Sequence, residues 1–222
     1  MFGRIVPRYD LMNALMTFGR DASWRCLTAK AADPQNGLAL DLATGTGDLA
    51  LALWREGARE VVGLDFCPEM LEAAFRKLPP EAAPAVRFVQ GDALRLPFPD
   101  QTFDCVASAF LLRNVADLEA SLVEMARVLK PGGRLTSLDL THPRPGPLGW
   151  GAWLYSRHLV PLLGWAVAGD RAAYNYLPRS LEGFPGAPEL ARMMERAGLV
   201  RADYRLLGLG MVALHRALKP SV

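Results

Sequence analysis

Short apolar runs alternate with amphipathic segments along residues 38–140, and this alternation constrains the fold more than any other feature of the chain. Five apolar runs predict β-strands, over 38–43, 60–65, 86–92, 103–110 and 134–140. The segments between them predict helices over 48–56, 68–78 and 117–130, the last of which is stopped by Pro131-Gly132-Gly133. Such alternation implies a mainly parallel sheet with right-handed crossovers.

The end of the chain adds two strands of opposite direction. A helix is predicted over 187–197, followed by strands over 200–207 and 210–218. Because only Gly208-Leu209 separates these two strands, we expect them to pair as an antiparallel hairpin. The predicted architecture is an α/β, Rossmann-like fold with a mostly parallel seven-stranded sheet and an antiparallel C-terminal hairpin.

Two segments flank or interrupt this pattern. Residues 8–32 predict helix with a break at Phe18-Gly19, so we expect a helical cap over residues 1–36 before the first strand. Residues 37–222 then form the main domain. Within it, about 142–185 is rich in proline, glycine and aromatic residues, and we predict that this insertion covers the substrate.

Composition excludes several classes of protein. Half of the chain is apolar (51%) and its net charge is only +2, spread without the basic block that a nucleic-acid groove needs, so no nucleic-acid partner is predicted. Three cysteines and three histidines show no metal-ligand spacing, so no metal is predicted. The longest apolar region, 146–169, is broken by charged residues and proline, and no leader peptide is visible. We therefore expect a cytoplasmic protein.

The turn after the first strand predicts a nucleotide-like ligand. In LDLATGTGDLA (40–50) an apolar run passes into Gly45-Thr46-Gly47 and then into a helix, which fits the dinucleotide pattern G-x-G-x-x-A. Asp65 follows Gly45 by 20 residues, the distance at which an acid accepts hydrogen bonds from a ribose diol. Both features suit a nicotinamide dinucleotide and S-adenosylmethionine equally.

Three further observations favour S-adenosylmethionine. Asp41 stands directly before the turn, where a carboxylate would repel a pyrophosphate and attract an ammonium and a sulfonium. Asp92 and Ala93 end the third strand, where an adenine edge would lie. The elements PFPDQTFDCV and LKPGGRL then follow in order. We predict a methyltransferase; a nicotinamide enzyme and a non-catalytic nucleotide-binding fold remain as alternatives.

Plainer interpretations stand beside these. Asp65 and Asp92 could instead be helix-capping residues without a role in ligand binding. Asp104 could be an ordinary acid at a strand edge. The carboxyl ends of parallel strands nevertheless meet at one edge of a sheet, so Asp41, Asp65 and Asp92 are expected to lie near one another.

Motifs along nearly the whole chain point to one family. They include the start YDLMN, then DLATGTGDLA, FLLRNV, RVLKPGGRL, YLPRS and VALHR. The chain resembles the ubiquinone/menaquinone biosynthesis C-methyltransferases of the UbiE/MenG type, which implies the class I S-adenosylmethionine-dependent methyltransferase fold. The start, LRNV, YLPRS and VALHR make this resemblance specific, since the other motifs are common to many class I enzymes.

The resemblance implies C-methylation of a polyprenylated quinol, most directly demethylmenaquinol to menaquinol. It implies Thr46 in the glycine turn, Asp65 on the ribose, and Asp92 with Ala93 at the adenine. The chain departs from the family pattern in three places, which alter the lining of the site. Leu111 and Ala109 replace the usual glycine and serine, and Asp139-Leu140-Thr141 replaces Glu-Phe-Ser.

Candidate catalytic residues follow the fourth strand. Arg113 and Asn114 would face the acceptor there, with the guanidinium stabilising a quinolate or holding a water that takes its proton. An ion pair between Arg113 and a surface acid is the alternative. His142 is a second candidate proton acceptor, against a plain loop histidine, and Tyr174 and Tyr176 line the quinol pocket or simply pack.

Several choices stay open at this stage. Trp150, Trp153 and Leu154 either dock on the inner face of the cell membrane or close over the active site. The ubiquinone precursor, another small aromatic acceptor and an RNA-binding module are alternatives to menaquinone synthesis. The oligomeric state is also open, with a homodimer among the assemblies that the sequence allows.

Overall fold

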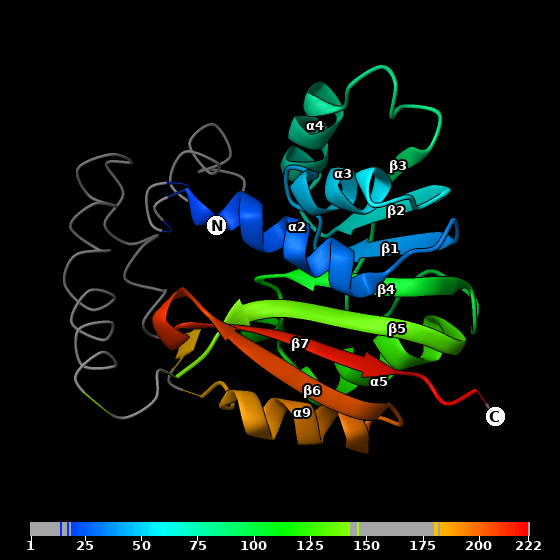
Figure 1. Cartoon of the computed structure of the whole chain (residues 1–222). Helices are drawn as coiled ribbons and strands as arrows, with labels where there is room; N and C mark the ends of the chain where they lie inside the picture. The colour runs from blue at the N-terminus through cyan, green and yellow to red at the C-terminus, as the bar shows by residue number, and fades with distance from the viewer. Residues whose placement is uncertain are drawn as a thin grey trace.

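The structure, a computed structural model, describes residues 19–142, 146, 180, 181 and 183–221, together with Ala14 and Thr17. Seven strands form one sheet in the order β3-β2-β1-β4-β5-β7-β6 (Figure 1). Among these strands only β7 runs against the others, since it pairs antiparallel with both β5 and β6. The predicted seven-stranded sheet with its antiparallel hairpin is confirmed.

The elements alternate as the sequence predicts. The strands are β1 (Leu38–Leu42), β2 (Glu60–Asp65), β3 (Val86–Gln90), β4 (Phe103–Ala109), β5 (Leu129–Leu140), β6 (Val200–Leu207) and β7 (Val212–Leu218). The helices are α2 (Arg20–Ala32), α3 (Asp48–Arg55), α4 (Pro68–Lys77), α5 (Leu118–Val128) and α9 (Ala187–Arg196), with short 3-10 helices η2 (Leu112–Asn114) and η4 (Gly208–Gly210).

Helices cover both faces of the sheet (Figure 1). Successive strand residues point to opposite faces, so the central strands are buried on both sides and read as continuous apolar runs. On β1, Ala39 packs with α2 and α3, whereas Leu40 packs in the opposite core with α5 and α9. The carboxyl ends of the parallel strands lie at the left of Figure 1, the edge at which α/β sheets bind their ligands.

The fifth strand begins earlier than predicted, and the helix before it ends earlier. α5 stops at Val128, and β5 runs from Leu129 through the Pro131-Gly132-Gly133 segment that was expected to end the helix. The distant Lys219 explains this, because its Nζ donates to the carbonyl oxygens of Ala126, Arg127 and Leu129. A lysine from the last strand's end thus caps the helix.

The helix α2 is part of the sheet's covering layer. Gly19, with φ of +70°, precedes its first residue and confirms the predicted break at Phe18-Gly19. Trp24 on α2 is buried against Leu138 of β5 and Leu214 of β7. The rest of the predicted cap, residues 1–13, and most of the predicted insertion 142–185 lie outside the described residues, so those domain boundaries stay predictions.

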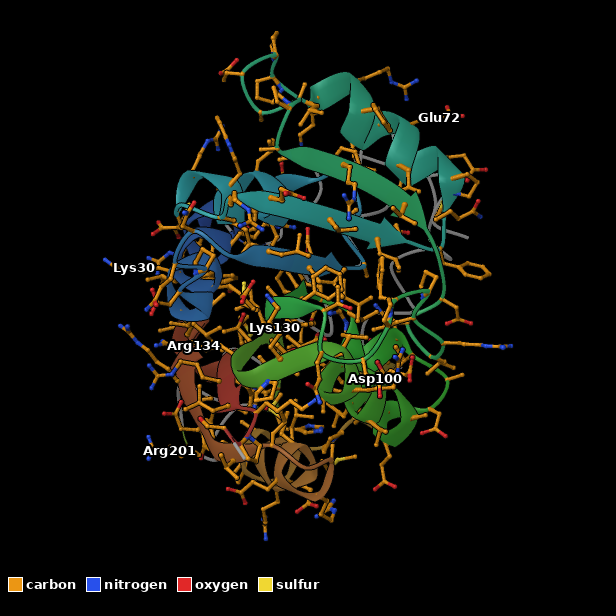
Figure 2. The ribbon with its side chains drawn as sticks, turned by 90° about the vertical axis from the view of Figure 1, so that its right-hand side faces the viewer. Lys30, Glu72, Asp100, Lys130, Arg134 and Arg201 are labelled. Atoms are coloured by element: carbon orange, nitrogen blue, oxygen red, sulfur yellow. The ribbon has the colours of Figure 1, made fainter. Side chains whose placement is uncertain are left out.

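The edge of the sheet opposite the site carries charged side chains. Figure 2 views this edge and shows Lys30, Lys130, Arg134 and Arg201 projecting from it. Two of these cations are paired: Lys130 Nζ lies 2.8 Å from Asp104 Oδ1, and Arg134 Nη2 lies 2.9 Å from Asp33 Oδ2. Asp104 also accepts the backbone N–H of Leu38, which confirms its interpretation as a structural acid at a strand edge. Within the described part of the chain, no helix is long and apolar enough to cross a membrane.

Candidate active site

The glycine turn after β1 is built from left-handed backbone. Gly45 and Gly47 have φ of +55° and +86°, and Ala43 has φ of +58° although it carries a side chain. On the neighbouring strand β4, Phe110 follows the last residue with φ of +62°. Non-glycine residues in this conformation cost free energy and gather at functional sites. Two of them, Ala43 and Phe110, lie at adjacent strand ends on this edge of the sheet.

Asp65 holds the turn in place from the end of β2. Its Oδ2 accepts the Gly45 N–H at 2.8 Å, and its Oδ1 accepts the Cys67 N–H at 2.9 Å. Burial raises the pKa of Asp65, and these backbone N–H groups oppose the rise. The carboxylate therefore connects the glycine turn to the turn before α4. Because each carboxylate oxygen accepts more than one hydrogen bond, a ribose diol can still bind there.

Asp41 lies under the turn, with its side chain fully buried. Its Oδ2 accepts the Thr44 hydroxyl at 2.6 Å, while Oδ1 has no hydrogen-bond partner among the described residues. Burial raises the pKa of Asp41 to about 7, against the lowering effect of the Thr44 hydroxyl, of the positive charge on Arg25 and of the nearby Ala50 backbone N–H. An acceptor oxygen in such a position is costly unless a ligand completes it.

Thr46 is also buried, and its hydroxyl accepts a hydrogen bond from Lys77 Nζ at 3.2 Å. Lys77, the last residue of α4, forms an ion pair with Asp48 at the start of α3. The lysine thus fixes the glycine turn against α4, a contact between residues 31 apart that no sequence motif indicated.

Asp92 and Ala93 lie beyond the end of β3, which stops at Gln90 instead of continuing to Asp92. The Gly91 N–H donates to the Asp65 carbonyl oxygen, which brings this turn beside β2. Asp92 is exposed, and its Oδ1 accepts the Leu94 N–H at 2.9 Å, so it stabilises its own turn and does not cap a helix.

Phe66 follows Asp65 directly, and its side chain is 72% exposed. The sequence analysis did not predict this exposed aromatic side chain.

Arg113 and Asn114 follow β4 at its carboxyl end, as predicted, and lie in η2. Arg113 Nη1 forms an ion pair with Asp139 Oδ1, which confirms the ion pair of the predicted alternative, but Asp139 is fully buried and is not a surface acid. The Asn114 side-chain amide donates to the Phe110 carbonyl oxygen at 2.9 Å. This hydrogen bond stabilises the left-handed backbone of Phe110. Among the described contacts, Asn114 therefore has a structural role.

Phe110 contacts two guanidinium groups. The guanidinium carbon of Arg25, on α2, lies 5.6 Å from the centre of the Phe110 ring, and that of Arg113 lies 5.4 Å from it. Both distances fall within the range of cation–π attraction. The ring thus places Arg25 and Arg113 on the same aromatic side chain.

A small pocket lies at the glycine turn and holds three of the seven predicted cofactor residues. It is lined by Arg25, Asp41, Ala43, Thr44, Gly45, Thr46, Asp48, Leu49 and Ala109. Three predicted cofactor residues, Asp41, Gly45 and Thr46, are brought together there, whereas Gly47, Asp65, Asp92 and Ala93 lie outside its lining. Ala109, a departure from the family pattern, forms one wall. Arg25 was missed because its place on a helix before the first strand gives no local signal.

The comparison with protein families decides the class. The model of the ubiE/COQ5 methyltransferase family matches residues 1–219. The chain belongs to this family. Membership confirms the predicted methyltransferase of the S-adenosylmethionine-dependent class.

Individual relatives agree with this assignment. The demethylmenaquinone methyltransferase of Thermus thermophilus is 46% identical over 222 residues, which cover 99% of this chain and 100% of the relative. The ubiquinone/menaquinone biosynthesis C-methyltransferase of Desulfotalea psychrophila is 44% identical, covering 99% and 89%. A solved S-adenosylmethionine-dependent methyltransferase from Aquifex aeolicus is 19% identical, with a TM-score of 0.64 over 94% of this chain and 97% of the other. It confirms the predicted fold.

Gly63 on β2 offers a test of how the pocket is supported. A Cβ at Gly63 would lie 2.7 Å from Phe88 Cδ1 and 2.8 Å from the Thr44 hydroxyl oxygen. We expect Gly63→Ala to displace Thr44 from Asp41 and to weaken cofactor binding about tenfold, measured by titration calorimetry. Gly37→Ala is the matched control, because its Cβ would meet Asp104 at 2.7 Å at the opposite edge of the sheet. Equal cofactor affinity in the two folded variants would contradict the expectation.

Proposed function

We propose that this enzyme transfers a methyl group from S-adenosylmethionine to a ring carbon of a polyprenyl quinol, with demethylmenaquinol as acceptor and menaquinol as product. The observation that supports the proposal is the shared Phe110 ring: Arg25, which lines the small pocket at the glycine turn, and Arg113 have their guanidinium carbons 5.6 Å and 5.4 Å from its centre. The name of the Thermus thermophilus relative supports this acceptor. The equivalent step in ubiquinone synthesis is the second candidate, because the Desulfotalea psychrophila relative is named for both pathways.

The donor side fits a ligand with a zwitterionic end, a ribose and a base. Asp41, Gly45 and Thr46 line the pocket for its amino-acid end. We infer that Asp65 would accept hydrogen bonds from the ribose diol. Phe66 would offer an apolar surface for the adenine, and Asp92 with Ala93 would offer polar groups for its edge. When bound, S-adenosylmethionine supplies a methyl group already activated by its sulfonium, so the protein's task is chiefly alignment and exclusion of water.

On the acceptor side, Arg113 supplies positive charge. Asp139 accepts hydrogen bonds from the Arg113 guanidinium, and its Oδ1 also accepts the Leu140 N–H at 2.8 Å. A guanidinium held in this way keeps its position as the quinol hydroxyl ionises and the ring gains negative charge. Arg113 thus favours the quinolate, whose adjacent ring carbon is the nucleophile.

His142 is a second candidate for the proton acceptor. Its Nε2 lies 2.9 Å from the Phe184 carbonyl oxygen. Because a carbonyl oxygen only accepts hydrogen bonds, Nε2 carries the proton in this contact, and Nδ1 is the ring atom left to take one. His142 follows β5 by two residues and is exposed at the active-site edge.

The polyprenyl tail of the acceptor is apolar, so its binding requires an apolar surface in addition to the site for the quinol ring. Most of the segment proposed to cover the quinol, with Tyr174, Tyr176 and the tryptophans at 150 and 153, lies outside the described residues. We keep the proposal that this segment receives the tail, in a cytoplasmic enzyme that touches the inner face of the membrane where its substrate resides. A homodimer also remains a proposal.

A direct assay tests the reaction. Purified enzyme, S-adenosylmethionine with a tritiated methyl group and a short-chain demethylmenaquinol are expected to yield labelled menaquinol that extracts into solvent. The ubiquinone precursor is assayed in parallel, and faster labelling of that quinol would favour the second candidate. Preferential labelling of added RNA or protein would overturn the proposal. Accumulation of demethylmenaquinone in cells that lack the protein is the expected result in vivo.

A further inference from the structure

A row of apolar side chains lies at the carboxyl edge of the sheet, on the acceptor side. It begins with Phe110, directly after β4, and continues with Leu140 at the end of β5 and Leu207 at the end of β6. All three pack against the small core that contains Trp24 and Val212, and each remains partly exposed. An apolar ligand would bury the exposed part of these side chains and gain free energy from the hydrophobic effect.

Strand pairing makes the row continuous. Val212 of β7 pairs with Leu140 on one side and with Leu207 on the other, and the Phe110 N–H donates to the Leu138 carbonyl oxygen at 2.7 Å. Residues that pair directly across two strands place their side chains on the same face of the sheet. Neighbouring strands lie about 4.8 Å apart, so the three steps from β4 to β6 give a row about 14 Å long. Each isoprene unit adds four carbon atoms to a chain, with bonds of about 1.5 Å, so about three extended units cover this length.

The turn from β6 to β7 adds an exposed leucine beyond Leu207. Leu209 is 72% exposed, and its φ of +58° lies between Gly208 at +54° and Gly210 at +88°. A single exposed leucine is ordinary, but of the large apolar side chains that are exposed in the described ranges, only Leu209 has a left-handed backbone. A leucine in this conformation is strained where glycine would be relaxed, and such strain gathers at functional sites. The geometry therefore indicates a use for the Leu209 side chain itself.

Contacts fix this turn beside the row. A Cβ at Gly208 would lie 3.0 Å from Trp24 Cη2, so the turn packs closely on α2. The N–H of Thr141, directly after β5, donates to the Met211 carbonyl oxygen at 2.8 Å. Figure 1 shows the turn at the left, at the same edge of the sheet as the carboxyl ends of the parallel strands. Leu209 is therefore held at the β6 end of the row.

We propose that the row from Phe110 to Leu209 binds the polyprenyl tail of the acceptor, and that Leu209 makes the enzyme favour tails of about three or more isoprene units. The inference rests on the proposed function, because that function supplies a quinol with an apolar tail. The Arg113 guanidinium lies over the Phe110 ring, so a quinol ring at Arg113 has the start of the row beside it. A single row of partly buried side chains suits one linear chain better than the surface of a bilayer.

The first experiment measures kcat/KM for two demethylmenaquinols in solution without vesicles, one with a single isoprene unit and one with three. In Leu209→Asn the value for the three-unit quinol is expected to fall about fivefold, because part of an apolar contact is lost. The value for the one-unit quinol is expected to stay at that of the wild type, because its tail ends before the turn. Val200→Asn, at an exposed residue at the other end of β6, is the control and keeps both values.

Two results would overturn the proposal. Equal losses with the two quinols would show that Leu209 acts on the fold or on the site for the ring. Wild-type values with both would show that Leu209 contacts no tail, and would leave a bilayer as the remaining partner. Asparagine tolerates the left-handed backbone, so Leu209→Asn is expected to keep the wild-type melting temperature. Leu209→Gly removes the same contact and relaxes the backbone, so the same selective loss is expected with an equal or higher melting temperature.

The second experiment separates the tail contact from methyl transfer. The oxidised quinones, whose rings are not nucleophilic, are titrated against the enzyme. The Kd of the three-unit quinone is expected to be about fivefold higher in Leu209→Asn than in the wild type. This difference without methylation of any quinol would remove the proposed function and leave the tail contact standing. Methylation with equal Kd values in the two proteins would remove the tail contact and leave the proposed function standing.

Discussion

Replacing Asp65 with asparagine is expected to weaken the binding of S-adenosylmethionine about a hundredfold. Asparagine keeps the size of the side chain, but its amide nitrogen would face the N–H of either Gly45 or Cys67, both of which now donate to the carboxylate. The variant would lose one of these charge-assisted hydrogen bonds and its bonds to the ribose diol. Each contributes about 1.5 kcal/mol or more, and two of them correspond to roughly the stated loss.

The control for Asp65 lies on the same strand. Glu60 lies at the other end of β2, and among the described residues its carboxylate forms ion pairs only with exposed Arg59 and Arg87. Glu60→Gln is expected to keep the wild-type Kd and a similar melting temperature. Titration calorimetry on both variants measures the difference. Wild-type affinity in Asp65→Asn would contradict the prediction and would show that the Asp65 carboxylate only stabilises the two turns and does not bind the cofactor.

Replacing Arg113 with lysine is expected to lower kcat about a hundredfold while the Kd for S-adenosylmethionine stays within about twofold. Lysine keeps a positive charge beside the buried Asp139, so the fold survives, but it lacks the planar fork that holds the guanidinium in place. The loss is of the size found when one group that stabilises developing charge is removed. Arg113→Ala is less informative, because an unpaired Asp139 would destabilise the fold by about 3–5 kcal/mol.

Arg127→Lys is the matched control for this change. Arg127 forms ion pairs with Glu124 and Asp100 and donates to the Phe98 carbonyl oxygen, away from the site. Its replacement is expected to leave kcat nearly unchanged. Single-turnover kinetics with the quinol, at saturating cofactor, measure the chemical step. An equal loss of cofactor affinity and turnover in Arg113→Lys would place Arg113 on the donor side instead.

The fold was predictable because its signals are local. Strands such as 60–65 are contiguous apolar runs, and the predicted bounds match those of β2. The end of α5 was not predictable, since the residue that caps it, Lys219, is more than 90 positions away from two of the carbonyl oxygens it binds. The first residues of β5 were also not predictable, because their extended conformation depends on pairing with β4. The β4 residues lie outside the short window of neighbouring residues on which a sequence prediction rests.

The candidate site divides in the same way. Asp41, Gly45 and Thr46 were predicted because they share one short turn, and the structure brings all three to the pocket. Arg25 and Asp139 were not predicted as partners of the site. Arg25 reaches the pocket only because α2 folds back across the sheet, and Asp139 appeared in the sequence only as a conservative change at the end of a strand. Both are contacts between elements, which no motif encodes.

The Phe110 ring has a consequence for engineering the enzyme. Since Arg25 and Arg113 both lie against this one ring, a change that repacks either arginine alters the support of the other. Donor and acceptor preferences are then not separate design variables, and substitutions on the two sides should show epistasis. A library that varies residues around Arg113 to accept a new quinol would do better to vary Arg25 and Phe110 in the same clones.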